Sequence, residues 1–128
     1  MAKIAMIGAG SLIFCKTLMS GFLATPALEG SEYRLMALTH RRLDKMKDFV
    51  DRMVKDNGVR ATVTATTNRR EALKGADYVV VMIQVGGVDG FKVDYEVPMR
   101  HGVDNCIGDT MGPGGIFRAQ RHIPALLE

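Results

Sequence analysis

Short apolar runs that alternate with amphipathic stretches most strongly constrain the fold of this chain. Four runs have the length and composition of β-strands, and they lie at residues 3–7, 33–38, 61–66 and 79–83. Helical spacing of apolar residues follows at 11–24, 39–55, 92–101 and 114–128, with a brief helix at 68–74 that Asn68 can cap. Strands and helices in alternation form βαβ units on a parallel sheet. We therefore predict a Rossmann-like α/β fold, a doubly wound parallel sheet with strand order 3-2-1-4.

The length of the chain fits one domain. At 128 residues it can bury a core, and no linker or internal repeat divides it, so we predict a single dinucleotide-binding domain over residues 1–128. We predict half of a full dinucleotide-binding fold, so the chain is expected to be a fragment of a longer enzyme. The continuous apolar run at 79–83 is typical of a strand buried on both faces. At an open sheet edge it predicts a homo-oligomer or association through this strand.

Composition and charge exclude several classes of function. No apolar run reaches the roughly 18 residues that a membrane span requires. A net charge of +3, with no basic stripe interleaved with aromatic residues, argues against nucleic acid as a partner. Cys15 and Cys106 lack Cys-x-x-Cys spacing, and no histidine lies at metal-ligand spacing from them. We therefore expect two reduced thiols, no metal site within this chain and a cytoplasmic protein.

Two glycines directly follow the first predicted strand and open the first helix. In this context Gly8 makes the turn, Gly10 admits a phosphate, and N–H groups of the helix receive its charge. The usual third glycine is absent, since Ile13 occupies its position. We predict that Gly8, Gly10, Ser11 and Leu12 bind the pyrophosphate of a dinucleotide. The alternative role of Ser11 is to cap the helix.

The end of the second predicted strand lacks the acidic residue that binds the ribose hydroxyls of NAD. Between the end of this strand and Asp44 there is no carboxylate, and the first helical turn instead carries two arginines. The helix dipole disfavours cations there by about 0.3–1 kcal/mol, which is consistent with an anion bound at this turn. Our hypothesis is that Thr39, His40, Arg41 and Arg42 hold a 2′-phosphate and favour NADP over NAD. The alternative is a solvated basic turn.

A second glycine-rich segment, residues 109–118, precedes the last predicted helix. Three glycines and a proline between an Asp-Thr pair and an amphipathic run indicate a tight turn that opens a helix. Such a turn lets main-chain N–H groups approach a ligand closely. The segment therefore predicts one wall of a site. Asp109 is either an active-site carboxylate or a cap that holds the turn.

Together these motifs resemble glycoside hydrolase family 4. The resemblance is carried by Gly8-Ala9-Gly10-Ser11 with Phe14, Gly75-Ala76-Asp77, Gln84-x-Gly86-Gly87, Arg100-His101-Gly102 and Asp109-Thr110-x-Gly112-Pro113-Gly114-Gly115-Ile116-x-Arg118-Ala119-x-Arg121-x-Ile123-Pro124. The last motif is most similar to the α-galactosidase and α-galacturonidase branches, and the resemblance runs along the whole chain. It implies an NAD-dependent and usually manganese-dependent hydrolase of α-glycosides.

The resemblance also implies a redox route, in place of the two-carboxylate route of most glycosidases. The nicotinamide takes a hydride from C3 of the sugar, a base removes the acidified C2 proton, and the glycosidic oxygen leaves from C1. Water then adds and the hydride returns. A metal ion polarises the sugar oxygens as a Lewis acid.

By position, the resemblance implies a role for three groups of residues. Gly8, Gly10, Ser11 and the turn at 37–41 match cofactor contacts. Gln84, Gly86 and Gly87 line the nicotinamide side of the cofactor. Asp109, Thr110 and Gly112 border the sugar, with Asp109 as the candidate catalytic residue.

Two departures from the family limit what carries over. The family usually has Asp where Ala37 stands and an acidic residue near Thr39 to Arg41, which places standard recognition of NAD in doubt. Its metal-binding Cys and His, its Asn-x-Asn-Pro-type substrate loop and its proposed base Tyr lie further along than this sequence reaches. We therefore expect Mn²⁺ only in a full-length enzyme, and no catalysis by this chain alone.

Two other functions remain open from the sequence. One is a stand-alone or redesigned dinucleotide-binding module without chemistry of its own. The other is a fragment of an oxidoreductase of the lactate and malate dehydrogenase type, which would require a catalytic His and a substrate-binding Arg further along the chain. His101 and His122 are expected to be surface or helix residues.

Overall fold

The computed structural model describes residues 1–105 and 111–128. Their contacts define two compact units, Met1–Met82 and Ile83–Glu128. The first unit contains β1 (Lys3–Ile7), α1 (Leu12–Leu23), β2 (Glu32–Met36), α2 (His40–Asp56), β3 (Thr62–Thr66), α3 (Arg69–Leu73) and β4 (Tyr78–Val81), and the second contains α4 (Gly87–Arg100) and α5 (Pro113–Leu127). The organisation of residues 1–128 as a single domain stays a prediction. None of the described helices is both long and apolar enough to cross a membrane.

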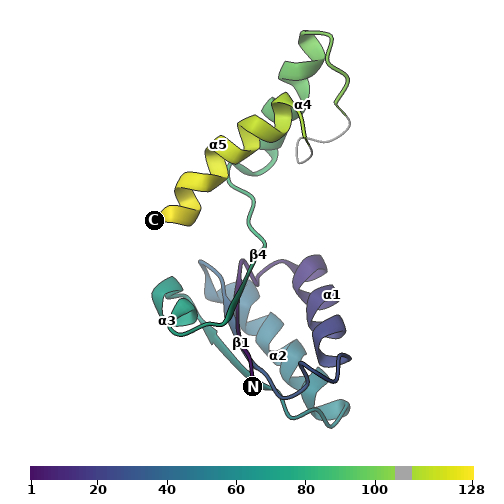
Figure 1. Cartoon of the computed structure of the whole chain (residues 1–128), viewed down its shortest axis with the longest axis vertical. Coiled ribbons are helices and arrows are strands. Elements are labelled where there is room, and N and C mark those ends of the chain that lie inside the picture. The colour runs from purple at the N-terminus through teal and green to yellow at the C-terminus, as the bar shows by residue number, and fades with distance from the viewer. Residues whose placement is uncertain (106–110) are drawn as a thin grey trace. The chain divides into compact units, whose positions relative to one another are not determined.

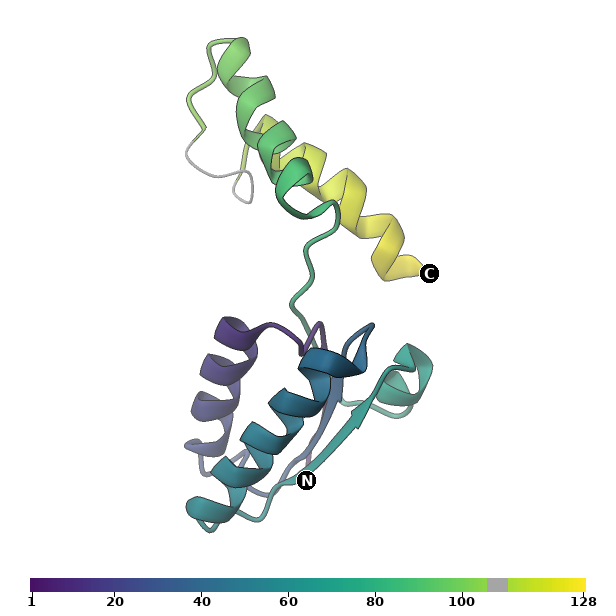
Figure 2. The same ribbon diagram turned by 180° about the vertical axis from the view of Figure 1, so that it is seen from behind.

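The first unit is a parallel four-stranded sheet with helices on both faces (Figures 1 and 2). The strand order is β3-β2-β1-β4, which confirms the predicted α/β class and the predicted order. β1 and β2 pair in register along their whole length, so that Ile7 lies opposite Met36. The loops that follow these two strands therefore leave the same edge of the sheet side by side.

The main core lies between the sheet and helices α1 and α2. Successive side chains of a strand alternate between the two faces, and those on this face are all apolar. The apolar stripe of α2, which the helical spacing predicted, is buried against these strand side chains. The buried cluster contains Ile4, Met6, Ala9, Cys15, Met19, Leu23, Tyr33, Leu35, Ala37, Leu43, Met46 and Val50. Burial raises the pKa of the Cys15 thiol to about 11, so Cys15 is an inert core residue.

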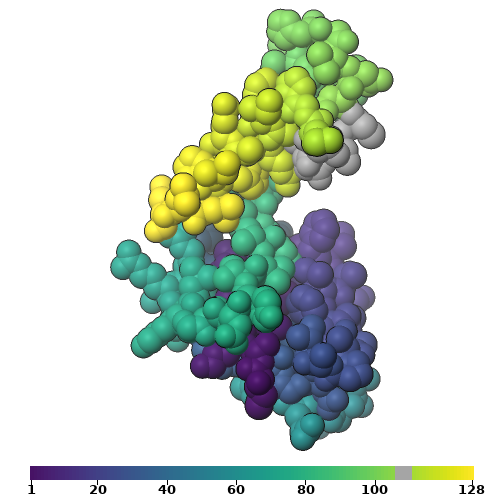
Figure 3. Space-filling model, viewed as in Figure 1, coloured from purple at the N-terminus to yellow at the C-terminus, as the bar shows by residue number. Residues whose placement is uncertain are grey.

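Strand β4 is partly exposed, which corrects the expectation of a strand buried on both faces. Tyr78 is 62% exposed, Val79 50% and Val81 43%. The space-filling view shows this segment at the surface of the first unit (Figure 3). β4 is the edge strand, with β1 as its neighbour, and α3 packs on β1, β2 and β3. The strand thus lies at the sheet edge as expected, and association through it stays a prediction.

Candidate functional site

The turn after β1 has a conformation that only glycine adopts readily. Gly8 has a φ of 88°, in the left-handed region. The N–H groups of Gly8 and Ala9 both donate to the carbonyl oxygen of Met36, at 2.9 and 2.8 Å. The N–H of Ser11 donates to the carbonyl oxygen of Gly8 at 3.1 Å. The turn is therefore fixed to the carboxyl end of β2.

Gly10 brings this turn into contact with the start of α2. A Cβ atom at Gly10 would lie 3.4 Å from the Cβ of Arg42 and 3.6 Å from the Cβ of Ala37. The predicted pyrophosphate residues and the predicted ribose residues thus lie together at the carboxyl edge of the sheet. Crevices at this edge are where open α/β sheets bind their ligands.

The N-terminus of α1 has the polarity to attract an anion. Ser11 occupies the N-cap position, yet its side chain makes no capping hydrogen bond, and the first turn carries no acidic residue. The first N–H groups of a helix lack acceptors within the helix, and they attract negative charge. Leu12 is 60% exposed beside them. Among the described residues the hydroxyl of Ser11 makes no capping bond, which fits the predicted phosphate site.

The basic turn at the start of α2 is open to solvent. Thr39 is the N-cap of α2 without a side-chain capping bond, and the first turn contains no acidic residue. His40 Nδ1 lies 3.4 Å from Asp44 Oδ1, in a mostly exposed pair. Within residues 1–105 and 111–128, the exposed side chains of Arg41 and Arg42 form no ion pair or hydrogen bond. Two cations without a partner in the described part of the chain therefore lie at the start of α2, which approaches the glycine turn at Arg42.

The second predicted cofactor group belongs to the second unit and begins a helix. Gly86 is the N-cap of α4 with a φ of 82°, and Gly87 follows with a φ of 54°. The helix starts five residues before the predicted residue 92, so Gly90 lies within it. The N–H of Gly90 donates to the carbonyl oxygen of Gly86 at 2.9 Å. A Cβ at Gly90 would lie 3.1 Å from Nε of Arg121, so this glycine is required for packing.

An ion pair with a buried carboxylate joins α4 to α5, and sequence reasoning did not identify it as functional. Asp94 is fully buried, and Arg121 donates to both carboxylate oxygens, Nη1 to Oδ1 at 2.6 Å and Nη2 to Oδ2 at 2.5 Å. These hydrogen bonds raise the pKa of the Arg121 guanidinium. The signal in the sequence is helical spacing, which places Asp94 on the same helix face as the uncharged residues Gly90, Phe91, Val97 and Pro98.

The glycine-rich turn before α5 packs closely on α4. Gly112, a predicted substrate residue, is the N-cap of α5 and has a φ of 136°. Asn105, which is 6% exposed, donates from Nδ2 to the carbonyl oxygen of Asp94 at 3.3 Å. Its Oδ1 would lie 3.6 Å from a Cβ at Gly112. The other two predicted substrate residues, Asp109 and Thr110, lie outside the described residues.

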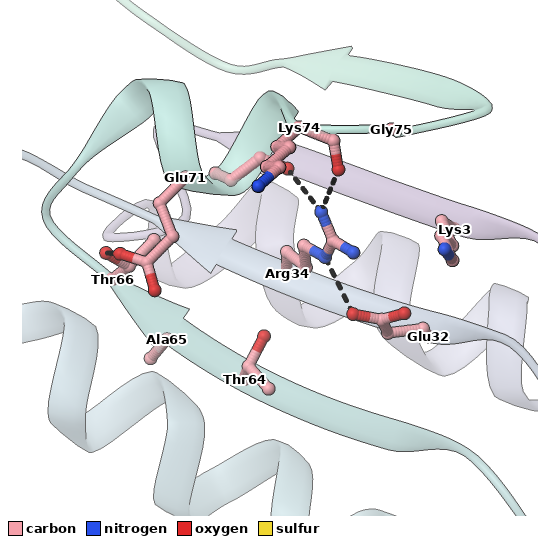
Figure 4. Close-up of a pocket in the computed structure, with 10 residues that line it drawn as sticks. Lys3, Glu32, Arg34, Thr64, Ala65, Thr66, Glu71, Lys74 and Gly75 are labelled. Carbon is pink, nitrogen blue, oxygen red and sulfur yellow. Dashed lines mark hydrogen bonds and ion pairs between the residues drawn. The ribbon is translucent and has the colours of Figure 1, made fainter.

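A cavity of about 530 Å³ lies away from the predicted site, on the α3 face of the sheet (Figure 4). Arg34 crosses it and donates to Glu32 Oε1 at 2.7 Å and to the carbonyl oxygen of Lys74 at 2.5 Å. The hydrogen bond from Arg34 lowers the pKa of Glu32. Glu71 accepts from the hydroxyl of Thr66 at 2.6 Å. These four polar side chains therefore satisfy one another or the backbone.

The described residues present no metal centre. Within residues 1–105 and 111–128, no three His, Cys, Asp or Glu side chains converge as metal ligands. The positive dipole end of α1, the glycine turn and the unpaired arginines instead suit a phosphorylated ligand.

Fold and turn together define the class of Rossmann-like α/β domains, in which a glycine turn after β1 opens the first helix. The model of the family described as Family 4 glycosyl hydrolase matches residues 3–128, and the chain belongs to this family.

Relatives of known activity match nearly all of the chain. It is 44% identical to an alpha-galactosidase of Rhizobium meliloti over 98% of its length, and 39% identical to an alpha-galactosidase of Bacillus subtilis over 100%. These matches cover only 26% and 30% of the two relatives, so the chain spans less than a third of their length.

A solved structure supports the same family. The 6-phospho-beta glucosidase of Thermotoga maritima, determined with manganese, NAD+ and glucose-6-phosphate, has a TM-score of 0.79 and 28% identity. The match covers 97% of this chain and 30% of that one. The resemblance stated from the motifs is thus confirmed.

Proposed function

We propose that this chain is the dinucleotide-binding N-terminal part of an α-galactosidase-like glycoside hydrolase. The observation that carries the proposal is the contact of the Gly8–Gly10 turn with the start of α2, at the carboxyl edge of β1 and β2. Gly8, Gly10, Ser11 and Leu12 would bind the pyrophosphate, and the turn at 39–42 would bind the adenosine ribose. NAD in the related Thermotoga maritima structure supports a dinucleotide as the ligand.

The finer form of the proposal is a preference for NADP. Ala37, Leu38 and Thr39 follow β2 without a carboxylate, while Arg41 and Arg42 are exposed and unpaired in the part of the chain that the structure describes. A 2′-phosphate would supply the acceptor oxygens for these guanidinium groups, and an arginine forms strong, often bidentate hydrogen bonds to phosphate. The relative with bound NAD supports the dinucleotide, whereas the basic turn alone supports NADP.

Cofactor titration by calorimetry tests both forms. We expect NADP to bind more tightly than NAD, and an Arg41→Gln/Arg42→Gln variant to lose about 10- to 100-fold in NADP affinity, since a hydrogen bond to a charged group contributes roughly 1.5–3 kcal/mol. Its affinity for NAD should change about threefold or less. Arg60→Gln is the matched control, because Arg60 is exposed and precedes β3. It therefore lies at the amino ends of the strands, away from the carboxyl ends where the cofactor is proposed to bind. Equal or tighter binding of NAD by the unaltered chain would refute the preference for NADP.

Hydrolysis is proposed for a longer protein and not for this chain alone. When bound, the nicotinamide would supply a hydride acceptor, and Gln84, Gly86 and Gly87 would border it, with Asp109, Thr110 and Gly112 toward the sugar. The described residues offer no metal centre. We expect the 128-residue chain, given Mn²⁺, NAD or NADP and a reductant, to release no nitrophenol from a nitrophenyl α-galactoside. Turnover by this chain would show that it already contains the catalytic machinery.

A binding module without catalysis and self-association through β4 are also proposals. A binding module without catalysis would show the cofactor titration described above and no hydrolysis in any longer form. Association of two chains through β4 would appear as a dimer in light scattering, and it would be lost when Val79→Lys charges the sheet edge.

A further inference from the structure

Helix α5 holds the turn at the start of α4 through two consecutive side chains. The first is His122, whose Nε2 lies 3.1 Å from the N–H of Val85 and accepts its hydrogen bond. Its Nδ1 lies 2.8 Å from the carbonyl oxygen of Arg118, which can only accept. Nδ1 therefore carries the proton, and Nε2 is left free to accept from Val85. The imidazole fixes the backbone one residue before the left-handed Gly86.

The second side chain is Arg121, which packs against the same turn. Its Nε would lie 3.4 Å from a Cβ at Gly86 and 3.1 Å from one at Gly90. The carboxylate of Asp94 holds the guanidinium in place by two hydrogen bonds. Nε itself is buried and has no hydrogen-bond partner in the described part of the chain. The planar guanidinium group thus packs directly against Gly86 and Gly90.

Without these contacts the turn would have many conformations. Gly86 and Gly87 are both in the left-handed region, and glycine loses more conformational freedom on ordering than any other residue. A ligand that needs one conformation of the turn binds more weakly in proportion to the fraction of molecules that adopt it. Side chains that fix the turn therefore strengthen binding without touching the ligand.

We infer that Arg121 and His122 are positioning residues, which fix the turn at 84–87 in the conformation that receives the nicotinamide half of the cofactor. The inference rests on the proposed function, because that proposal assigns Gln84, Gly86 and Gly87 to the nicotinamide side. Neither side chain is a catalytic residue. Each acts through the backbone of Val85 or Gly86.

The test compares NAD with ADP-ribose, which lacks the nicotinamide. The unaltered chain should bind NAD more tightly than ADP-ribose. His122→Phe keeps a ring of similar size but removes the acceptor for Val85. We expect it to weaken NAD binding about tenfold while the affinity for ADP-ribose stays the same. The amide of Val85 should also lose its protection from hydrogen exchange.

His101→Phe is the matched control, since His101 is exposed at the end of α4 and lies far along the helix from the turn. It should change neither ligand's affinity. An equal loss of both ligands in His122→Phe, or an unchanged ratio of the two affinities, would overturn the inference. So would equal affinities of the unaltered chain for NAD and ADP-ribose. Failure of the unaltered chain to bind NAD, NADP or ADP-ribose would instead overturn the proposed function.

Discussion

Replacing Gly114 with alanine is expected to disrupt the packing of α4 on α5, with a loss of about 3 kcal/mol or more in the stability of the second unit. A Cβ at this position would lie 2.3 Å from the carbonyl oxygen of Asp94 and 2.6 Å from Nδ2 of Asn105. The first of these atoms belongs to the backbone of α4 and cannot turn away. Relief of the clash requires the two helices to separate, which would expose Asp94. Hydrogen exchange of amides in Gly87–Arg100 measures the loss, because it reports on this unit directly.

Gly21→Ala supplies the control for the same chemical change. Gly21 lies in α1, is exposed, and has open space where a Cβ would stand. Alanine has the higher helix propensity, so this substitution should stabilise the chain by about 0.5–1 kcal/mol. The two glycine substitutions are thus expected to act in opposite directions. If Gly114→Ala left exchange in α4 unchanged, the close approach of α5 to Asp94 would be contradicted.

The sequence could predict the sheet and its glycine turn because their signals are local. The short, mainly apolar runs of β1 and β2 and the 3.6-residue spacing in α2 can be recognised from neighbouring residues alone. Once the strand order follows from right-handed crossovers, the ends of β1 and β2 must be adjacent. The contact of Gly10 with Ala37 and Arg42 is a consequence of that adjacency. For this reason the predicted pyrophosphate and ribose residues lie together.

The second unit was harder to predict because its determinants are distant in sequence. Gly90 looks like a loop glycine until Arg121, 31 positions later, is placed against it at 3.1 Å from its Cβ position. Asp94 looks like a surface residue until its partner on α5 is known. The exposure of β4 was missed for the same reason. An apolar run in the sequence does not show how much of the strand neighbouring elements cover. Tertiary contacts decided each of these points.

Two kinds of glycine therefore occur near the proposed cofactor residues. Gly8 and Gly86 have left-handed backbones that make turns, with φ values of 88° and 82°. Gly90 and Gly114 are required by close packing between α4 and α5. A substitution of the first kind strains the backbone, whereas one of the second kind separates helices. Experiments on the glycines should be interpreted with this division in mind.

Removing the guanidinium of Arg121 is expected to have the other large effect. Arg121→Met keeps most of the length of the side chain but leaves the carboxylate of Asp94, which is fully buried, without its partner. Breaking one side of a buried ion pair costs about 3–5 kcal/mol. Exchange in α4 should accelerate accordingly. The control is Arg100→Met, because Arg100 and Glu96 form a pair at 3.2 Å with side chains 73% and 51% exposed. Exposed pairs contribute about 0–1 kcal/mol, so this variant should be near neutral.

The double variant Asp94→Leu/Arg121→Met separates the charge from the packing. A buried pair replaced by apolar side chains of similar volume is often neutral or even stabilising, so the double variant should recover most of the stability that Arg121→Met loses. Recovery would show that the single variant failed because of an unpaired buried charge. If the double variant were as unstable as the single one, the shape of the guanidinium against Gly86 and Gly90 would be what holds the helices. If Arg121→Met were as mild as Arg100→Met, a strong contribution of the Asp94–Arg121 pair to the packing of α5 on α4 would be contradicted.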